Sequence, residues 1–289
     1  MRIEKNVVFG MYSGLALLMD VHRPENPNGC GVLFVAGSGW HASLDWAAVG
    51  LKDNENQVRT WVPPLLRSGY TVFAVNHRAA PRFLYPAALE DVQRALRFLR
   101  VHAGEYGIEA TRIGGVGGSS GAHLVCLAAM LGAPGTIGDP DPVNRECAKL
   151  QCIVLRAAPT DLRRMVVDAD SEGKRYVLSF LGLLPEGDTT ETEIYDEASP
   201  LRHVSRESPP TLLIHGEADR TVPYWQSLAM EAALRAVGAS VRLVGIPGGV
   251  HGPDFGADGK PRAQWPDYLG EMVSWLDRHL RARPAGAGT

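Results

Sequence analysis

Short apolar runs alternate with helical patterns along most of this chain, and this alternation limits the possible folds more than any other feature. The runs cover residues 31–36, 70–76, 111–117, 152–158, 211–215 and 241–246. Because these runs are nearly continuous in apolar residues, both of their faces are expected to be buried. Buried strands joined by helices predict an α/β fold, with a mostly parallel central sheet and helices on both faces.

The connecting segments carry apolar residues at spacings of three and four, which is typical of amphipathic helices. The helices expected on this pattern cover residues 85–103, 120–131, 224–237 and 265–281. Before the first buried run, residues 3–9 and 15–22 are expected to form a hairpin around Tyr12-Ser13-Gly14.

Two stretches depart from the alternation. Residues 41–66 are long, polar and rich in tryptophan, and residues 159–209 separate two strands with one helical piece near 172–183. Long excursions at one sheet edge commonly form lids or substrate walls. We therefore expect a single domain over residues 1–283, with a lid-like insertion at about 159–209. A flexible tail of small residues is expected at 284–289.

Composition excludes several classes of protein. The 289 residues are 45% hydrophobic and 21% charged, which suits one sizeable core and neither a disordered chain nor a coiled coil. The formal net charge of −3 provides no positive surface for a phosphate backbone, so no nucleic-acid partner is expected.

No membrane anchor, metal site or cofactor site is visible in the sequence. The apolar run over residues 10–19 has roughly half of the ~20 residues that a bilayer span requires. Glu4 is unusual for a secretory signal, so a cytoplasmic protein is expected, although a signal removed earlier would leave no trace. The four cysteines lack metal-binding spacing, and Cys126 and Cys152 lie in apolar stretches typical of buried thiols. The oligomeric state stays open between monomer and homodimer.

A candidate nucleophile lies in Gly117-Gly118-Ser119-Ser120-Gly121, which matches G-x-S-x-G between an expected strand and an apolar helix. A sharp turn in this setting would expose the Ser119 hydroxyl above the sheet. It would also aim the Ser120 N–H, at the helix start, toward a developing oxyanion. Without this setting, the same motif could be a glycine-rich turn with no chemistry.

A serine nucleophile needs a general base and a carboxylate that orients it. Asp219 and His251 each follow an expected strand, in the order Ser, Asp, His that many serine hydrolases share. We therefore predict Ser119, Asp219 and His251 as the catalytic residues. Glu217 and Asp254 are alternative acids. His215 and His123 are expected to make structural hydrogen bonds.

The loop after the third expected strand, residues 31–36, reads Ala36-Gly37-Ser38-Gly39-Trp40. Its small residues let backbone N–H groups turn inward, so Ser38 and Gly39 are predicted, with Ser120, to form an oxyanion hole. Three aromatic residues are candidates for the substrate pocket, or else pack beneath a lid: Trp40, Trp46 and Phe180.

These motifs resemble the α/β-hydrolase superfamily, and within it the hormone-sensitive-lipase-like and feruloyl/acetylxylan-esterase-like carboxylesterases. The resemblance spans residues 15–280, and four segments carry it: N-H-R-A-A-P at 76–81, Y-P-A-A-L-E-D-V at 85–92, S-S-G-A-H-L at 119–124 and H-G-x-x-D-x-x-V-P at 215–223. Two positions depart from the family's H-G-G-G-W. Ala36 replaces a histidine that helps to fix the oxyanion loop, and Ser38 replaces a glycine.

The resemblance implies a serine carboxylesterase that hydrolyses short-chain acyl esters of a small molecule or carbohydrate through an acyl-enzyme, without a cofactor. One alternative is a peptidase of the prolyl-oligopeptidase type, although such enzymes usually carry a large gating domain for which this chain has no room. Another is a ligand-binding protein that kept the fold and lost turnover.

Overall fold

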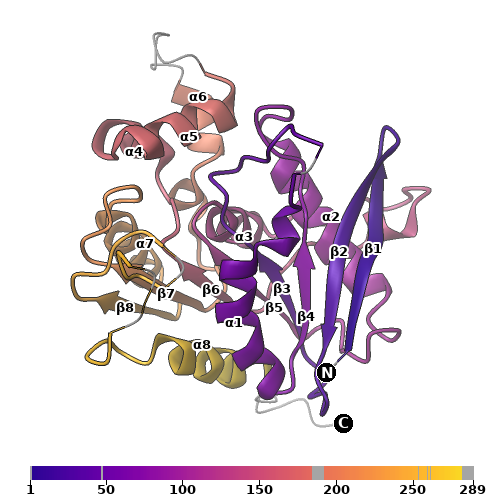
Figure 1. Ribbon diagram of the computed structural model, residues 1–289. Coiled ribbons are helices and arrows are strands. Elements are labelled where there is room, and N and C mark those ends of the chain that lie inside the picture. Colours follow the sequence, from indigo (N-terminus) through magenta and orange to yellow (C-terminus); the bar gives the residue numbers. More distant parts are fainter. Residues whose placement is uncertain are drawn as a thin grey trace.

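Eight strands form one sheet in the computed structural model, in the order β1-β2-β4-β3-β5-β6-β7-β8 (Figure 1). The structure describes residues 2–46, 48–183, 192–252, 254–258, 260 and 262–281. The strands are β1 Arg2–Tyr12, β2 Leu15–Arg23, β3 Gly31–Val35, β4 Thr71–Val75, β5 Ile113–Gly118, β6 Ile153–Arg156, β7 Thr211–Gly216 and β8 Val241–Ile246. Strands β3 to β8 pair in parallel, and the β1–β2 hairpin joins β4 in antiparallel orientation. The mostly parallel sheet predicted from the sequence is confirmed.

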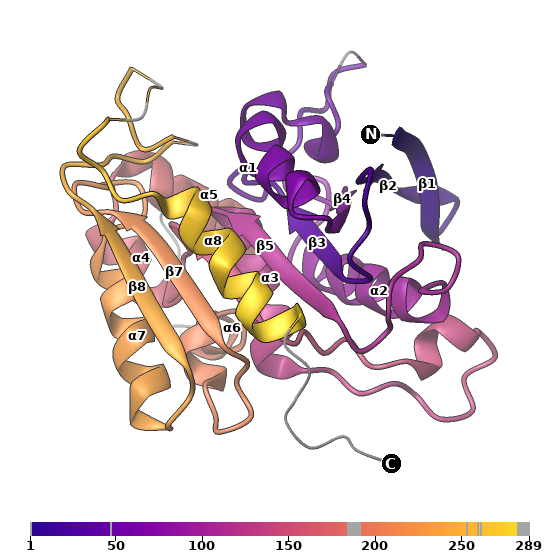
Figure 2. The ribbon, with the colours of Figure 1, turned by 90° about the horizontal axis from the view of Figure 1, so that it is seen from below.

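Helices cover both faces of this sheet, as predicted. They are α1 Glu55–Arg67, α2 Ala87–Val101, α3 Ser120–Leu131, α4 Leu162–Asp168, α5 Ser171–Leu181, α6 Thr192–Glu197, α7 Trp225–Ala236 and α8 Tyr268–Leu276. Helices α1 and α8 lie on one face, whereas α2, α3 and α7 lie on the other (Figure 2). Helix α8 begins three residues later than expected and continues as a π-helical turn at Asp277–Arg281.

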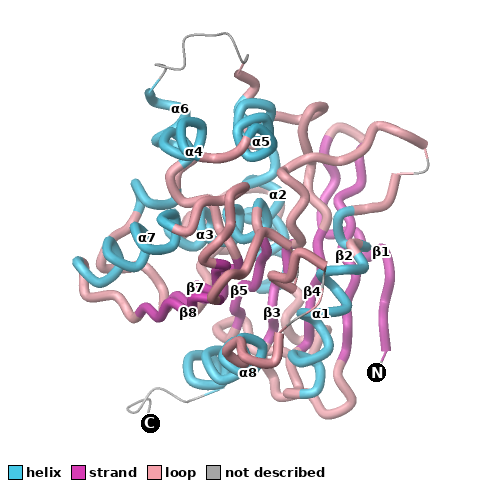
Figure 3. The backbone as a smooth tube through the Cα atoms, turned by 60° about the vertical axis from the view of Figure 1, so that its left-hand side comes forward, coloured by secondary structure: helices cyan, strands magenta, loops and turns pink. Residues whose placement is uncertain are grey.

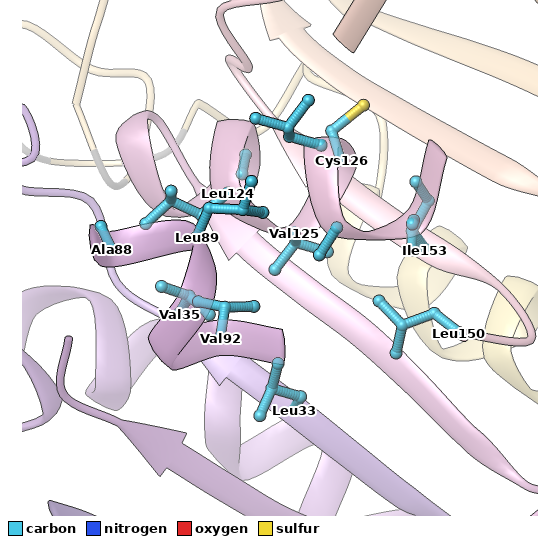
Figure 4. Close-up of a cluster of buried hydrophobic side chains, with 14 of the residues drawn as sticks. Leu33, Val35, Ala88, Leu89, Val92, Leu124, Val125, Cys126, Leu150 and Ile153 are labelled. Carbon is cyan, nitrogen blue, oxygen red and sulfur yellow. The ribbon is translucent and has the colours of Figure 1, made fainter. Parts of the chain in front are cut away.

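The alternation of side chains along each strand divides the core between the two faces. Leu33 and Val35 of β3 pack toward α2 and α3, where they meet Val92 and Leu124 (Figure 4). Phe34, which lies between them, points to the other face and packs with α1 and α8. Because both faces of the central strands are covered, these strands read as continuous apolar runs.

Helix α1 is the main difference from the expected organisation, because residues 41–66 were predicted to form a polar wall or lid. Instead, Asn54 caps a helix whose Trp61 and Leu65 are buried against the sheet and α8. Pro63 and Pro64 lie inside this helix. Proline usually interrupts a helix because it lacks the N–H and crowds the preceding turn. Here the burial of the apolar face outweighs that local preference.

Helices α4, α5 and α6 follow β6 and gather beyond one edge of the sheet, at the top of the views in Figures 1 and 3. Helix α5 corresponds to the helical piece expected near residues 172–183. Residues 184–191 of this insertion and the tail at 284–289 lie outside the described residues, so their predicted character stays a prediction.

The parallel strands all end at the same edge of the sheet, below these helices. The last residues of β5, β6 and β7 are Gly118, Arg156 and Gly216. Ligands of open α/β sheets bind outside the carboxyl ends of the strands, so this edge positions the candidate site.

Candidate active site

Ser119 lies in a sharp turn between β5 and α3. Its backbone has φ 51° and ψ −122°, a conformation that side-chain-bearing residues rarely adopt. The turn brings backbones so close that a Cβ atom on Gly121 would lie 2.1 Å from the carbonyl oxygen of Val35. The Ser119 N–H donates to the carbonyl of Arg156 at 2.8 Å, which ties the turn to β6. The strand, turn and helix expected around this serine are confirmed.

The structure brings Ser119, His251 and Asp219 together from three separate loops. Ser119 Oγ lies 3.0 Å from His251 Nε2, and His251 Nδ1 lies 2.7 Å from Asp219 Oδ2. Because an ionised carboxylate only accepts hydrogen bonds, the imidazole proton belongs on Nδ1. That tautomer leaves Nε2 free to accept the hydroxyl proton of Ser119.

The Asp219 carboxylate is buried and held by several donors. Its Oδ1 accepts the N–H groups of Thr221 and Val222 at 3.0 and 2.9 Å, and His215 Nε2 lies 3.4 Å from Oδ2. Burial raises the pKa of Asp219, but hydrogen bonds from His215 and His251 outweigh it, so this pKa lies below its ordinary value. The group therefore provides a fixed negative charge beside the imidazole at neutral pH.

The alternative acids take no part in this arrangement. Asp254 Oδ1 accepts the hydroxyl of Thr60 at 3.1 Å, and within the described part of the chain neither Asp254 nor Glu217 bonds to His251. Asp219 is therefore the carboxylate that the geometry selects.

His123 and His215 make the structural hydrogen bonds predicted for them. His123 Nδ1 accepts the Trp40 indole N–H at 3.0 Å, and its Nε2 donates to the carbonyl of Ala198 at 2.7 Å. His215 joins Ser227 Oγ at 2.7 Å and the carbonyl of Val222 at 2.9 Å. Both rings are fully buried and lie outside the cavity described below.

The loop after β3 is held by side chains from α1. Gly37 donates its N–H to Gln57 Oε1 at 2.8 Å, and its carbonyl accepts Gln57 Nε2 at 3.0 Å and Asn54 Nδ2 at 3.2 Å. A Cβ on Gly37 would lie 2.5 Å from the carbonyl oxygen of Gly118, so only glycine fits here. Gln57 was not identified from the sequence, because α1 itself was not predicted.

The three predicted oxyanion donors differ in their availability. The Ser38 N–H is already donated to Ser120 Oγ at 2.8 Å, because the Ser120 side chain turns back toward the loop. The Gly39 N–H donates to no acceptor in the described parts of the chain. Ser120 is the first residue of α3, where an N–H has no partner within the helix. The geometry thus favours Gly39 and Ser120 over Ser38.

A cavity of about 210 Å³ opens beside Ser119 and His251. Its remaining lining comes from the oxyanion loop, α1, β6, the insertion and the loops after β7 and β8: Gly37, Ser38, Gly39, Trp40, Gln57, Arg156, Pro159, Met165, Glu172, Tyr176, Thr221, Val222 and Gly252. Of the three aromatic candidates for the pocket, only Trp40 lines this cavity. Phe180 does not line the cavity, but its ring stacks on the Trp40 ring with 4.6 Å between the ring centroids. Trp46 is fully exposed and borders a different hollow, because its loop runs over the surface.

Arg156 is a second site residue that sequence reasoning missed. It ends β6, is buried and lines the same cavity. A charged residue in an otherwise apolar run was the available signal, because arginine is almost never fully buried without a partner.

Metal and membrane features can be assessed for the described residues. Within them, no three histidine, cysteine or acidic side chains are placed to share a metal ion. In the same part of the chain, no helix has the length and apolar character needed to cross a bilayer.

Known proteins and one family model are similar to this chain in sequence. The family model of BD-FAE matches residues 19–234. Esterase LipQ of Mycobacterium tuberculosis is 30% identical over 68% of this chain and 46% of its own length. Ethyl acetate hydrolase of Pseudomonas putida is 28% identical over 92% of this chain and 80% of its own length. The chain spans about half the length of the first curated relatives that it matches.

Solved structures share the whole architecture. A truncated carbohydrate esterase from gut microbiota superposes with a TM-score of 0.77 at 24% identity, over 98% of this chain and 97% of its own. An acetyl ester-xyloside bifunctional hydrolase of Caldicellulosiruptor lactoaceticus gives the same TM-score at 22% identity, over 94% and 95%. Together with the sheet topology, these structures show that the chain has the α/β-hydrolase fold. The family model that matches residues 19–234 shows that the chain belongs to the BD-FAE family.

Proposed function

We propose that this protein is a serine carboxylesterase that hydrolyses short-chain acyl esters. The observation that carries the proposal is the continuous hydrogen-bonded series from Ser119 Oγ through His251 to Asp219, at 3.0 and 2.7 Å. A buried carboxylate, an imidazole of defined tautomer and a hydroxyl on a strained turn are the parts that nucleophilic acyl transfer requires.

In the proposed mechanism, His251 Nε2 takes the proton of Ser119 as Oγ attacks the ester carbonyl carbon. The carbonyl π electrons move onto oxygen, and the negative charge of Asp219 stabilises the imidazolium. When the tetrahedral intermediate collapses, the bond to the alkoxy oxygen breaks and His251 protonates the departing alcohol. Water then attacks the acyl-enzyme by the same steps, which release the acid and restore Ser119.

The Gly39 and Ser120 N–H groups are the proposed donors to the oxyanion. Among the described residues neither N–H has a hydrogen-bond partner, and Gly39 lines the cavity while Ser120 begins α3. Each oxyanion-hole donor contributes roughly 2.7–4 kcal/mol to the stabilisation of the transition state. Gln57 and Asn54 act as positioning residues, because they fix the Gly37 peptide from which the loop turns.

The size of the cavity supports a small acyl group. Its volume of about 210 Å³ lies below the ~300 Å³ at which drug-sized ligand pockets begin. Met165 of α4 and Tyr176 of α5 line it, so we propose that the insertion at 159–209 acts as a lid that walls the substrate. The names of ethyl acetate hydrolase and of the carbohydrate esterase agree with this substrate class.

The proposal is tested with aryl esters of increasing acyl length, run beside an acetylated oligosaccharide and an aminoacyl arylamide. Hydrolysis of the aryl acetate should exceed that of longer esters and of the arylamide. Ser119→Ala should lower kcat more than a thousandfold, whereas Ser43→Ala, at an exposed loop position, should leave kcat unchanged. Near-parental turnover in Ser119→Ala would place the nucleophile elsewhere. Preference for the arylamide would favour a peptidase, and ligand binding without hydrolysis would indicate a binding protein.

A further inference from the structure

Arg156 ends β6 and lies next to the proposed nucleophile, because it pairs with Gly118 of β5. Its backbone carbonyl accepts the Ser119 N–H at 2.8 Å, and its side chain lines the cavity that also contains His251. Residues 152 and 154 of the same segment pack with α1 and α8, so the alternation along β6 sends the Arg156 side chain toward that face. The guanidinium therefore enters the cavity from the side of α1 and α8.

The guanidinium of Arg156 is buried without a partner. The residue is 2% exposed, and its Nε and Nη2 atoms have no hydrogen-bond acceptor. No described residue forms an ion pair or hydrogen bond with any of its nitrogens. Arg78 shows the usual arrangement, because its guanidinium is equally buried but pairs with Asp91 at 2.8 Å and Glu90 at 2.9 Å. Burying a charge without a partner is costly, so such a group is expected to have a ligand.

The charges around Arg156 are engaged elsewhere. Asp219 and Asp254 act on it electrostatically from beyond ion-pair distance, but the first bonds to His251 and the second to Thr60. The Phe255 ring packs 5.0 Å from the guanidinium carbon and covers it from one side. Burial lowers the pKa of Arg156 to about 10, partly offset by these acids, so the group stays protonated at neutral pH.

Both polar and apolar side chains line this cavity. A Cβ on Gly118 would lie 2.5 Å from Gln57 Oε1 and 3.8 Å from Arg156 Cδ, so both side chains flank the residue before the nucleophile. Pro159, Met165 and Val222 add apolar lining, and the Glu172 carboxylate, which also lines the cavity, accepts the Tyr176 hydroxyl at 2.8 Å. A ligand with one apolar and one anionic portion matches this mixed lining.

We propose that Arg156 is a specificity-determining residue that binds a carboxylate carried by the substrate, so that the preferred esters are anionic. The inference rests on the proposed esterase function and adds the substrate class. The planar guanidinium presents its N–H groups in a fork that fits both carboxylate oxygens. The carboxylate belongs either to the acyl group, as in a dicarboxylic acid monoester, or to the alcohol, as in an acylated hydroxy acid.

Two matched pairs of esters test the proposal on the parental protein and distinguish these sources. The acyl pair is an aryl hemisuccinate and the aryl butyrate; the alcohol pair is acetoxyacetate and its amide. In one pair, kcat/KM should favour the anionic member about tenfold or more, chiefly through KM, as a charge-assisted hydrogen bond provides. The pair that shows the preference identifies the portion that Arg156 binds. Absence of a preference in both pairs, with the neutral esters hydrolysed, would overturn this inference alone. Absence of all hydrolysis would overturn the esterase function as well.

Two variants assign the preference to the guanidinium. Arg156→Met keeps an unbranched apolar stem but removes the charge, so the ratio of anionic to neutral kcat/KM should fall to about one. Arg156→Lys keeps the charge but not the fork, so an intermediate ratio is expected. A purely structural role would lower both members of a pair together and leave the ratio unchanged, which would contradict the proposal. Inhibition of the parental protein by succinate but not by butyramide would show, without a variant, that the cavity prefers a carboxylate.

Discussion

The Ser38 N–H donates to Ser120 Oγ at 2.8 Å, a hydrogen bond that joins the oxyanion loop to the start of the nucleophile helix. Ser38 departs from the family pattern that the sequence resembles, in which glycine occupies this position. The loop also lacks the family's histidine, which is Ala36 here. Ser120, Gln57 and Asn54 supply the contacts that hold the loop in this chain.

The Ser120 hydroxyl should therefore support turnover by fixing the loop. Ser120→Ala should lower kcat on an aryl acetate about two- to tenfold, since one hydrogen bond contributes roughly 0.5–1.5 kcal/mol. Steady-state kinetics measure this effect, and chemical denaturation shows whether the fold is retained. Turnover equal to or above the parental value would mean that the hydroxyl competes with the oxyanion for the Ser38 N–H.

Asp219, and not Asp254, should be the acid on which catalysis depends. Asp219→Asn removes the charge that stabilises the imidazolium and favours the wrong tautomer of His251, so kcat should fall by about a thousandfold or more. Asp254→Asn is the matched control, because within the described residues its carboxylate accepts the Thr60 hydroxyl and no other donor. The reverse ranking of the two variants in kcat would reassign the acid.

Acid should destabilise the fold through buried histidines. Burial lowers the pKa of His123 and of His77 to about 4, from 6.5. As the pH falls below 6.5, these histidines become protonated in the unfolded chain. In the folded chain they stay neutral until about pH 4. The free energy of unfolding should therefore decrease in that window, by up to about 1.4 kcal/mol per pH unit for each histidine.

Denaturant titrations between pH 4 and 7 measure this slope. His123→Gln should reduce the slope, because one of the buried titrating histidines is gone, whereas His203→Gln at the surface should not. An unchanged slope in His123→Gln would show that the acid sensitivity comes from other groups.

The strands and the order of the candidate residues could be predicted because they depend on local patterns. A run such as residues 31–36 is apolar because both of its faces are covered, and this is visible without coordinates. The same holds for Ser119, whose motif, preceding strand and following helix all lie within residues 113–131.

The missed features depend on contacts between distant segments. Helix α1 could not be predicted from the sequence, because Pro63 and Pro64 disfavour a helix locally. Its stability comes instead from packing on the sheet. Without α1, Gln57 could not be placed beside the oxyanion loop. The Ser38–Ser120 hydrogen bond spans 82 residues and depends on a side-chain orientation that no pattern encodes.

Phe180 should matter for stability and for substrate binding although it does not line the cavity. Its ring stacks on Trp40 at 4.6 Å, and Trp40 in turn donates to His123, so this contact joins the insertion to the oxyanion loop. Phe180→Ala should lower the free energy of unfolding by about 3–5 kcal/mol and raise KM for aryl esters, because Trp40 loses the ring that holds it. Trp46→Ala is the control, since Trp46 is fully exposed and should change stability by less than about 0.5 kcal/mol. Equal losses in the two variants, measured by denaturant titration, would show that the stacked pair does not anchor the insertion.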